Sequence, residues 1–145
     1  STAMKLYPLA LSCALLLAGQ ATAQITGRWK SVDENTGEVN SIVEIFESGG
    51  KIFGKVVQIF PKPGEDPDPL CDKCPAEDNR HRKKILGMEI IRHMEAEGDE
   101  YAGGEILDPE VGRVYRCKLW LEGKNLKVRG YLGPFYRTQT WLRVP

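Results

Sequence analysis

The sequence predicts an all-β fold, an eight-stranded antiparallel up-and-down β-barrel. Short runs rich in β-branched and aromatic residues alternate apolar with polar positions, and turns rich in Gly, Asn and Asp separate them. No segment after residue 23 has the period of an amphipathic helix. A meander of this size is expected to close, because closure removes the two unpaired edges that an open sheet would expose.

The first expected strand, residues 24–32, opens with Gly27 and Trp29 on the same face. Because glycine has no Cβ, the wide indole has room to fold beneath a closing sheet. We therefore expect Gly27 to be a structural residue and Trp29 to plug one end of the barrel. Any function would then lie at the other end.

The next two strands form the clearest hairpin, with the turn Ser48-Gly49-Gly50 between them and a bend expected at Gly54. Asp108-Pro109 begins a turn with proline at its second position. After the first, the expected strands cover residues 40–47, 51–60, 85–94, 100–107, 113–122, 126–132 and 136–144.

The N-terminal segment has the organisation of a signal peptide. Lys5 precedes an apolar run over residues 6–18, and Ala21-Thr22-Ala23 is a small-x-small site that predicts cleavage after Ala23. Residues 1–3, before Met4, are interpreted as an expression remnant. The predicted organisation is therefore a remnant and signal-peptide helix over residues 1–23 and one barrel domain over residues 24–145.

This leader is too short to span a bilayer, so cleavage leaves no stable membrane anchor. If the leader is retained, we expect its apolar helix to pack on another molecule and mediate self-association, for instance in the mouth of a neighbouring barrel. The 20 basic and 20 acidic residues balance, and removal of Lys5 with the leader shifts the net charge only to about −1. This neutrality argues against nucleic acid as a partner.

The longest expected loop covers residues 61–84 and contains five prolines, with acidic residues first and basic residues last. Cys71-x-x-Cys74 within it suits a local disulfide, half of a zinc site or a redox pair. In an oxidising compartment we favour the disulfide and predict no metal site. Cys117, on the apolar face of its strand, is expected to be a buried thiol.

The candidate ligand-binding residues are apolar side chains expected on inward faces: Val43, Ile45, Val57, Ile59, Met88, Tyr115, Leu119, Leu126 and Val128. The same residues could instead form a packed core, because an eight-stranded barrel is at the boundary between filled and hollow. Glu89, Arg129 and Gln139 could point into such a cavity or into water. His81 is interpreted as part of an exposed basic run, and His93 as an ordinary strand residue.

Several motifs resemble those of a known family. They are Gly27-Arg-Trp29, Ser41-Ile-Val-Glu-Ile45, Gly54-Lys-Val-Val57, Leu70-Cys-Asp-Lys-Cys74, Gly87-Met-Glu-Ile90, Gly103-Gly-Glu-Ile-Leu-Asp-Pro109, Val128-Arg-Gly130 and Arg137-Thr-Gln-Thr-Trp141. Together they resemble a family of small secreted bacterial proteins, the domain of unknown function 2147. The resemblance implies a lipocalin-like (calycin) barrel, in which an arginine near the chain end covers the N-terminal tryptophan; Arg143 and Arg137 are the candidates. It implies no activity.

These observations lead to two hypotheses. In the first, a non-enzymatic barrel binds a small apolar ligand, such as a lipid or fatty-acid-like molecule, in the bacterial periplasm or after secretion. In the second, the Cys71-x-x-Cys74 loop docks another envelope protein. The sequence contains no Ser/His/Asp set, phosphate-binding glycine loop or spaced carboxylate pair, so we predict neither an enzyme nor a cofactor.

Overall fold

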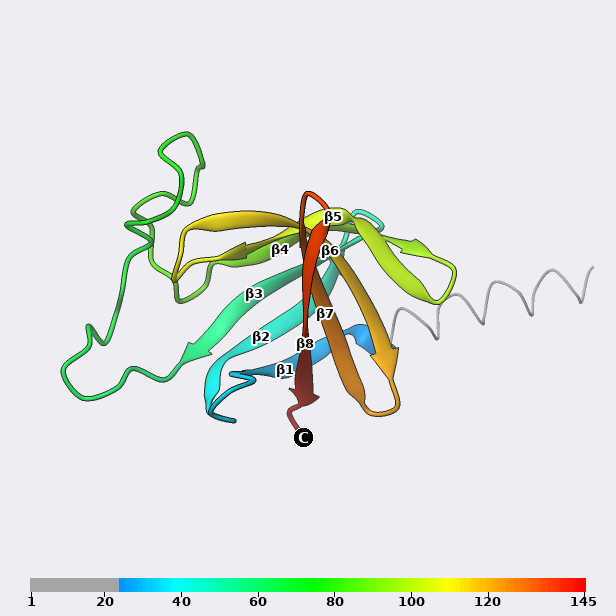
Figure 1. Ribbon diagram of the computed structural model, residues 1–145, viewed down its shortest axis with the longest axis horizontal. Helices are drawn as coiled ribbons and strands as arrows, with labels where there is room; N and C mark the ends of the chain where they lie inside the picture. Colours follow the sequence, from blue (N-terminus) through cyan, green and yellow to red (C-terminus); the bar gives the residue numbers. More distant parts are fainter. Residues whose placement is uncertain (1–23) are drawn as a thin grey trace, which may run out of the picture.

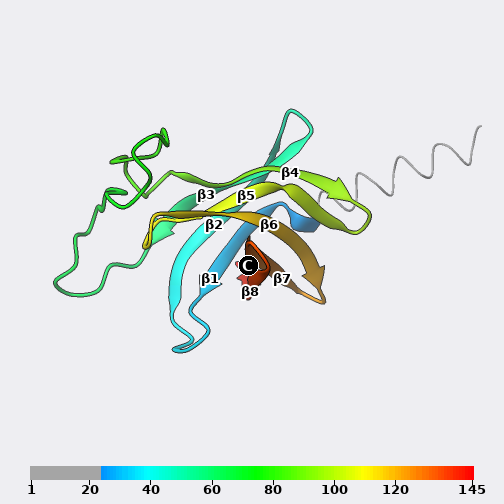
Figure 2. The ribbon, with the colours of Figure 1, turned by 45° about the horizontal axis from the view of Figure 1, so that its top comes forward.

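The computed structural model describes residues 24–145, and the predictions about the leader concern residues 1–23, outside this range. Eight antiparallel strands in sequence order form a closed barrel (Figures 1 and 2). This confirms the predicted fold class. Within the described residues no helix is long and apolar enough to cross a bilayer. The strands are β1 (Gly27–Val32), β2 (Val39–Ser48), β3 (Lys51–Ile59), β4 (Glu89–Glu97), β5 (Glu100–Asp108), β6 (Arg113–Glu122), β7 (Asn125–Leu132) and β8 (Phe135–Arg143).

One end of the barrel is closed by Trp29 and Arg143. The guanidinium of Arg143 lies 4.1 Å from the centroid of the Trp29 ring, and the Trp29 Nε1–H donates to the carbonyl of Ile25 at 2.9 Å. Arg143 also donates to the carbonyls of Thr26 and Gln24. Gly27 has a φ of 117°, and a Cβ there would lie 3.2 Å from Arg143 Nη1. Arg143 is therefore the cap of the buried Trp29, and Gly27 leaves room for the guanidinium of Arg143.

In β1, β2 and β7 the inward side chains become smaller from this closed end towards the other end. In β1 the inward positions are Trp29 and then Ser31, which lie opposite Val43 and Ser41 of β2. In β7 they are Leu126, Val128 and Gly130. Large side chains fill the closed half like an ordinary core, whereas small ones leave space beyond it.

Bulges alter the inward and outward pattern of two strands. The pairs Ile52–Met94 and Gly54–Ile91 leave one extra residue in β4, where His93 has a φ of 58°. His93 is consequently exposed, whereas Ile91 and Met94 on either side of the bulge are buried. In β5, Gly103 takes up a similar bulge with a φ of 80°.

The long connection is longer than predicted, because β4 begins at Glu89 rather than at residue 85. Residues 85–88 form a turn instead of a strand. The amide of Ile85 donates to the carbonyl of Pro69, and the amide of Met88 donates to the carbonyl of Ile85. The amide of Gly87 donates across to Val56. Ile85 and Met88 pack against the core from this turn, whereas Leu86 is exposed.

Replacing Arg143 with methionine should destabilise the barrel, because the variant loses a cation–π contact and the charge-assisted hydrogen bonds that join the chain ends. We expect a decrease of about 2 kcal/mol in the free energy of unfolding, measured by urea denaturation. Arg137→Met is the matched control, since the Arg137 guanidinium has no hydrogen bond or ion pair within residues 24–145, and should change stability little. Equal losses in both variants would contradict the assignment of Arg143 as the cap.

Candidate functional site: an open cavity in the barrel

A cavity of about 820 Å³ occupies the half of the barrel opposite Trp29. Strand residues form its wall, and the loops at the end of the barrel form its mouth. The wall includes Ser31, Ser41, Val56, Ile59, Ile90, Ile106, Tyr115, Val128, Gly130, Gln139 and Trp141. The barrel is therefore half packed and half hollow.

The predicted ligand-binding residues divide between these two halves. Ile59, Tyr115 and Val128 line the cavity. Four others fill the packed half, with side chains that are at most 1% exposed: Val43, Ile45, Leu119 and Leu126.

Two predicted lining residues have other positions. Met88 is buried but does not line the cavity. Val57 is displaced by a bulge: Val43 pairs with Val56 and Ile42 with Gln58, so Val57 is the extra residue of β3. Val56 lines the cavity instead, and Val57 is only half-buried. Strict alternation along residues 51–60 could not reveal this change of face.

Most polar groups in the wall are paired with each other. The Ser31 and Ser41 hydroxyl oxygens are 2.7 Å apart, and Trp141 Nε1–H donates to Gln139 Oε1 at 3.0 Å. Within the described residues the Tyr115 hydroxyl and the Arg137 guanidinium have no such partner, and the same holds for the Asn40 amide and the Tyr136 hydroxyl. Of these lining residues, Tyr115 and Arg137 lie together beside Gly130, where both are available to a ligand.

Tyr115 and Arg137 lie on either side of Gly130. Arg137 of β8 pairs with Gly130 of β7, and a Cβ on Gly130 would be 3.3 Å from the Cβ of Tyr115. Arg137 therefore lines the cavity and is not the cap of Trp29. The absence of a side chain on Gly130 leaves room for the Tyr115 ring.

The other polar residues proposed for the cavity take different positions. Gln139 faces inward, but Arg129 lies on the outer face, 4.2 Å from the Tyr136 ring centroid. Glu89 pairs with Arg92 at 3.2 Å and does not line the cavity. The register of β7 explains Arg129, because the inward positions of that strand are the even-numbered ones.

The mouth is acidic. Asp33, Glu34, Glu65, Asp66, Asp108 and Glu110 all line it, and Arg137 is the basic residue of the lining. The amides of Thr36 and Asn35 donate to Asp33, which lowers the pKa of this carboxyl and keeps it ionised at neutral pH. A small anion without an apolar part would be repelled here.

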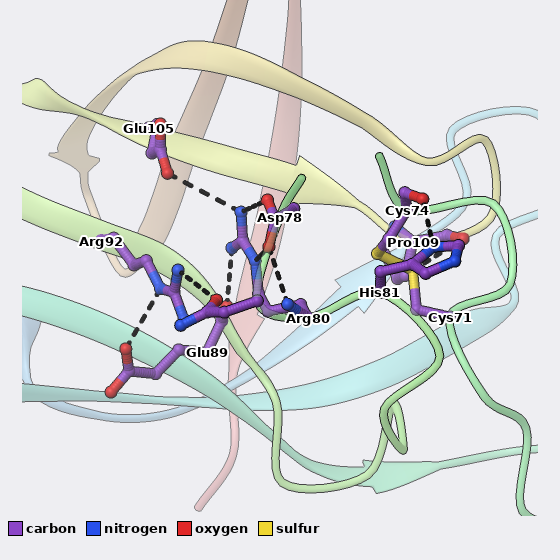
Figure 3. A network of polar contacts seen from close by, with 10 residues as sticks. Cys71, Cys74, Asp78, Arg80, His81, Glu89, Arg92, Glu105 and Pro109 are labelled. Atoms are coloured by element: carbon purple, nitrogen blue, oxygen red, sulfur yellow. Dashed lines mark hydrogen bonds and ion pairs between the residues drawn. A yellow bond between two sulfur atoms is a disulfide. The ribbon is translucent and has the colours of Figure 1, made fainter. Parts of the chain in front are cut away.

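The long loop folds beside the mouth and contains the predicted disulfide. Cys71 and Cys74 are bonded and buried (Figure 3). His81 Nδ1 lies 2.7 Å from the carbonyl oxygen of Cys74, so this histidine is tied to the disulfide turn rather than free in a basic run. Among the described residues no cluster of three or more His, Cys, Asp or Glu could hold a metal ion.

Arg80 anchors the loop to the barrel, a role that sequence reasoning missed. Its side chain is buried, donates to Asp78 and to the carbonyl of Glu89, and lies 3.7 Å from a Glu105 carboxylate oxygen (Figure 3). These hydrogen bonds hold the pKa of Asp78 at about 2. At the other end of the loop Lys84 pairs with Asp68 at 3.0 Å, so one acidic residue of the first part contacts one basic residue of the last part.

Cys117 is a free, buried thiol. Burial raises its pKa to about 12, so it remains protonated and unreactive at neutral pH. This confirms its interpretation as a small apolar residue. It does not line the cavity.

Comparison with known proteins identifies the family. A family model described as "uncharacterized protein conserved in bacteria", the domain of unknown function 2147, matches residues 27–143. The chain belongs to this bacterial family. Among curated proteins, none matches the sequence.

The fold of this family member is similar to that of a solved lipocalin. The structure of protein HP1028 from Helicobacter pylori, described as belonging to the lipocalin family, superposes with a TM-score of 0.69 at 17% identity, and 83% of each chain is covered. At this identity the similarity concerns the fold alone. It agrees with the closed eight-stranded barrel described above.

The Asp78–Arg80 pair should make stability depend on pH. Asp78 has a native pKa of about 2, below the ordinary value of 3.8, so its contribution is complete above about pH 4 and disappears as the pH falls through 2. Asp78→Asn should therefore cost on the order of 2 kcal/mol at pH 7, measured by denaturant unfolding.

The difference between the wild type and Asp78→Asn should vanish near pH 2. Asp99→Asn, in the exposed turn after β4, is the control and should have little effect at either pH. A pH-independent difference for Asp78→Asn would show that the ion pair is not its cause.

Proposed function

We propose that this protein is a non-enzymatic binding protein that holds one small apolar or amphipathic ligand, lipid-like or fatty-acid-like, inside its barrel. The observation that carries the proposal is the hollow half of the barrel, which opens at an accessible mouth. Its volume of about 820 Å³ lies within the range of about 300–1,000 Å³ typical of small-molecule sites.

The chemistry of the wall supports an apolar ligand. Val56, Ile59, Ile90, Ile106, Val128 and Trp141 contribute apolar side chains to the cavity. The paired hydroxyls of Ser31 and Ser41 need no partner from a ligand. Each methylene transferred from water into such surroundings contributes about 0.8 kcal/mol, so an acyl chain of moderate length would bind well.

A ligand with a polar end has two partners available near the mouth. The unpaired Arg137 guanidinium can donate two parallel hydrogen bonds to a carboxylate, and the Tyr115 hydroxyl can donate another. The acidic mouth disfavours anions in general, so burial of the apolar part must supply most of the affinity. This arrangement suits an amphipathic molecule whose tail reaches towards Trp29.

The non-enzymatic character and the exported location belong to the same proposal. Among the described residues that line the cavity there is neither a histidine nor a cysteine, the side chains that most often act as general base or nucleophile. The Cys71–Cys74 disulfide agrees with an oxidising compartment such as the periplasm, and the predicted leader would direct the chain there.

The alternative function, docking of another envelope protein through the long loop, has less support. The distinctive groups of this loop are engaged within the chain: the cysteines with each other, Arg80 with Asp78 and the barrel, and His81 with the Cys74 carbonyl. Their arrangement supports a role in holding the loop beside the mouth.

Filling the cavity should abolish binding. Ile59→Trp places an indole in the hollow half, whereas Val57→Trp changes a nearby residue of the same strand that does not line the cavity. Titration with a fluorescent long-chain fatty acid should show at least tenfold weaker binding for Ile59→Trp and an unchanged affinity for Val57→Trp. Circular dichroism verifies that both variants fold; equal affinities in the two variants would exclude the cavity as the site.

The role of Arg137 can be separated from that of the apolar wall. Arg137→Gln should weaken binding of a long-chain fatty acid about tenfold, because a charge-assisted pair is lost. The same substitution should leave the affinity for the corresponding alcohol unchanged. Isothermal titration calorimetry measures both; a parallel loss for acid and alcohol would show that Arg137 acts only through packing or access.

A further inference from the structure

The edge of the mouth formed by the β7–β8 turn differs from the rest of the surface. Large apolar side chains point into solvent here: Phe135 is 75% exposed, Tyr136 61% and Leu132 47%. The same three residues line the mouth of the cavity. Leu132 and Phe135 pair across a two-residue turn of Gly133 and Pro134, which presents them on a rigid tip.

Positive charge and aromatic rings continue from this tip along the outer face of β6–β8. The guanidinium of Arg129 lies 4.2 Å from the ring centroid of Tyr136 and 4.9 Å from that of Trp120, and Arg129 Nε donates to the Thr138 hydroxyl at 2.7 Å. Arg116 lies 5.7 Å from the Tyr131 ring centroid. The cation and the rings therefore form one ordered surface.

Among the described residues these two arginines have no carboxylate within ion-pair distance, although Glu105 lies opposite Arg116 in the sheet. Within residues 24–145 neither Arg116 nor Arg129 forms an ion pair, whereas the neighbouring Lys118 and Lys127 pair with Glu100 and Glu122. The acidic residues of the mouth belong to the other loops around it, over residues 33–34, 65–66 and 108–110. The β7–β8 side of the mouth is thus the cationic side.

We propose that this surface, the β7–β8 patch, docks on an anionic phospholipid bilayer. The patch consists of Leu132, Phe135 and Tyr136 at the tip and Arg116, Trp120, Arg129 and Tyr131 behind it. Tryptophan and tyrosine favour the interface of a bilayer, arginines near its surface attract anionic lipids, and an exposed phenylalanine can enter the acyl boundary. Charge complementarity favours this occupant over a second copy of the chain, whose corresponding patch would be equally positive.

Docking in this way would bring the cavity to the lipid. The tip residues also line one side of the mouth, so a bilayer that receives Phe135 touches the entrance directly. The β1–β8 junction, next to this tip, has the fewest paired residues of the barrel. β1 and β8 pair only at Trp29–Arg143 and Lys30–Leu142, near the closed end. The contact itself does not require a loaded cavity, so it can fail or succeed independently of the proposed ligand.

Vesicle flotation of the ligand-free protein tests the docking. The protein should float with vesicles of phosphatidylcholine and phosphatidylglycerol, and only weakly with phosphatidylcholine alone. Phe135→Ser should reduce binding about tenfold, and Arg116→Gln several-fold with a smaller dependence on salt. Val111→Ser removes a similarly exposed apolar residue, 57% exposed, from the neighbouring β5–β6 turn outside the patch, and should bind as the wild type does.

Three results would overturn the proposal. They are absence of wild-type flotation with the anionic vesicles, equal losses for Phe135→Ser and Val111→Ser, and a dimer in size-exclusion chromatography that Phe135→Ser disrupts without any flotation. The last would assign the patch to a second copy of the chain. Ile59→Trp, which fills the cavity, should float normally, and this separates failure of docking from failure of ligand binding.

Discussion

The contact of Arg143 with Trp29 is the constraint on which the rest of the structure depends. The guanidinium of Arg143 lies 4.1 Å from the centroid of the Trp29 ring. The contact joins the last strand to the first in the short segment where β8 and β1 pair. Closure there removes the sheet edges and buries Trp29 completely. Because this end is sealed by a large side chain, every inward position near it must be filled. The hollow can then form only at the far end.

The size of inward side chains sets where packing stops and the cavity starts. From the closed end towards the mouth, the inward residues of β1 change from Trp29 to Ser31. Those of β2 change from Ile45 and Val43 to Ser41, and those of β7 from Leu126 to Val128 and Gly130. A barrel with eight strands has an interior just wide enough for side chains to fill, so such reductions leave a real volume. Gly130 also makes room for Tyr115, which like Arg137 is a cavity residue whose side chain has no hydrogen-bond partner in the described chain. The position of the cavity therefore depends on these reductions in β1, β2 and β7.

The sequence predicted the barrel well and its interior less well. Periodicity and turn residues located all eight strands, and Gly27, Trp29, Arg143 and the disulfide took their expected places.

The alternating pattern failed to predict which way Val57 and His93 face, because both lie at bulges. One extra residue in a strand reverses the face of every later residue in that strand. The anchoring role of Arg80 was not predicted for another reason. Its burial depends on Asp78 and on Glu105, which is distant in the sequence, and a local sequence pattern does not indicate such a contact. The decrease in side-chain size towards Ser31, Ser41 and Gly130 was visible in the sequence and would have located the hollow half.

The central claim is that a ligand enters the half of the barrel farthest from Trp29. Backbone NMR during titration with a long-chain fatty acid tests this most directly, because each amide reports its own surroundings. Saturable shifts at Ser31, Ser41, Val128 and Gln139, with little change at Ile45 and Leu126, are the expected result. Shifts confined to the outer surface, or none at saturating ligand, would contradict it.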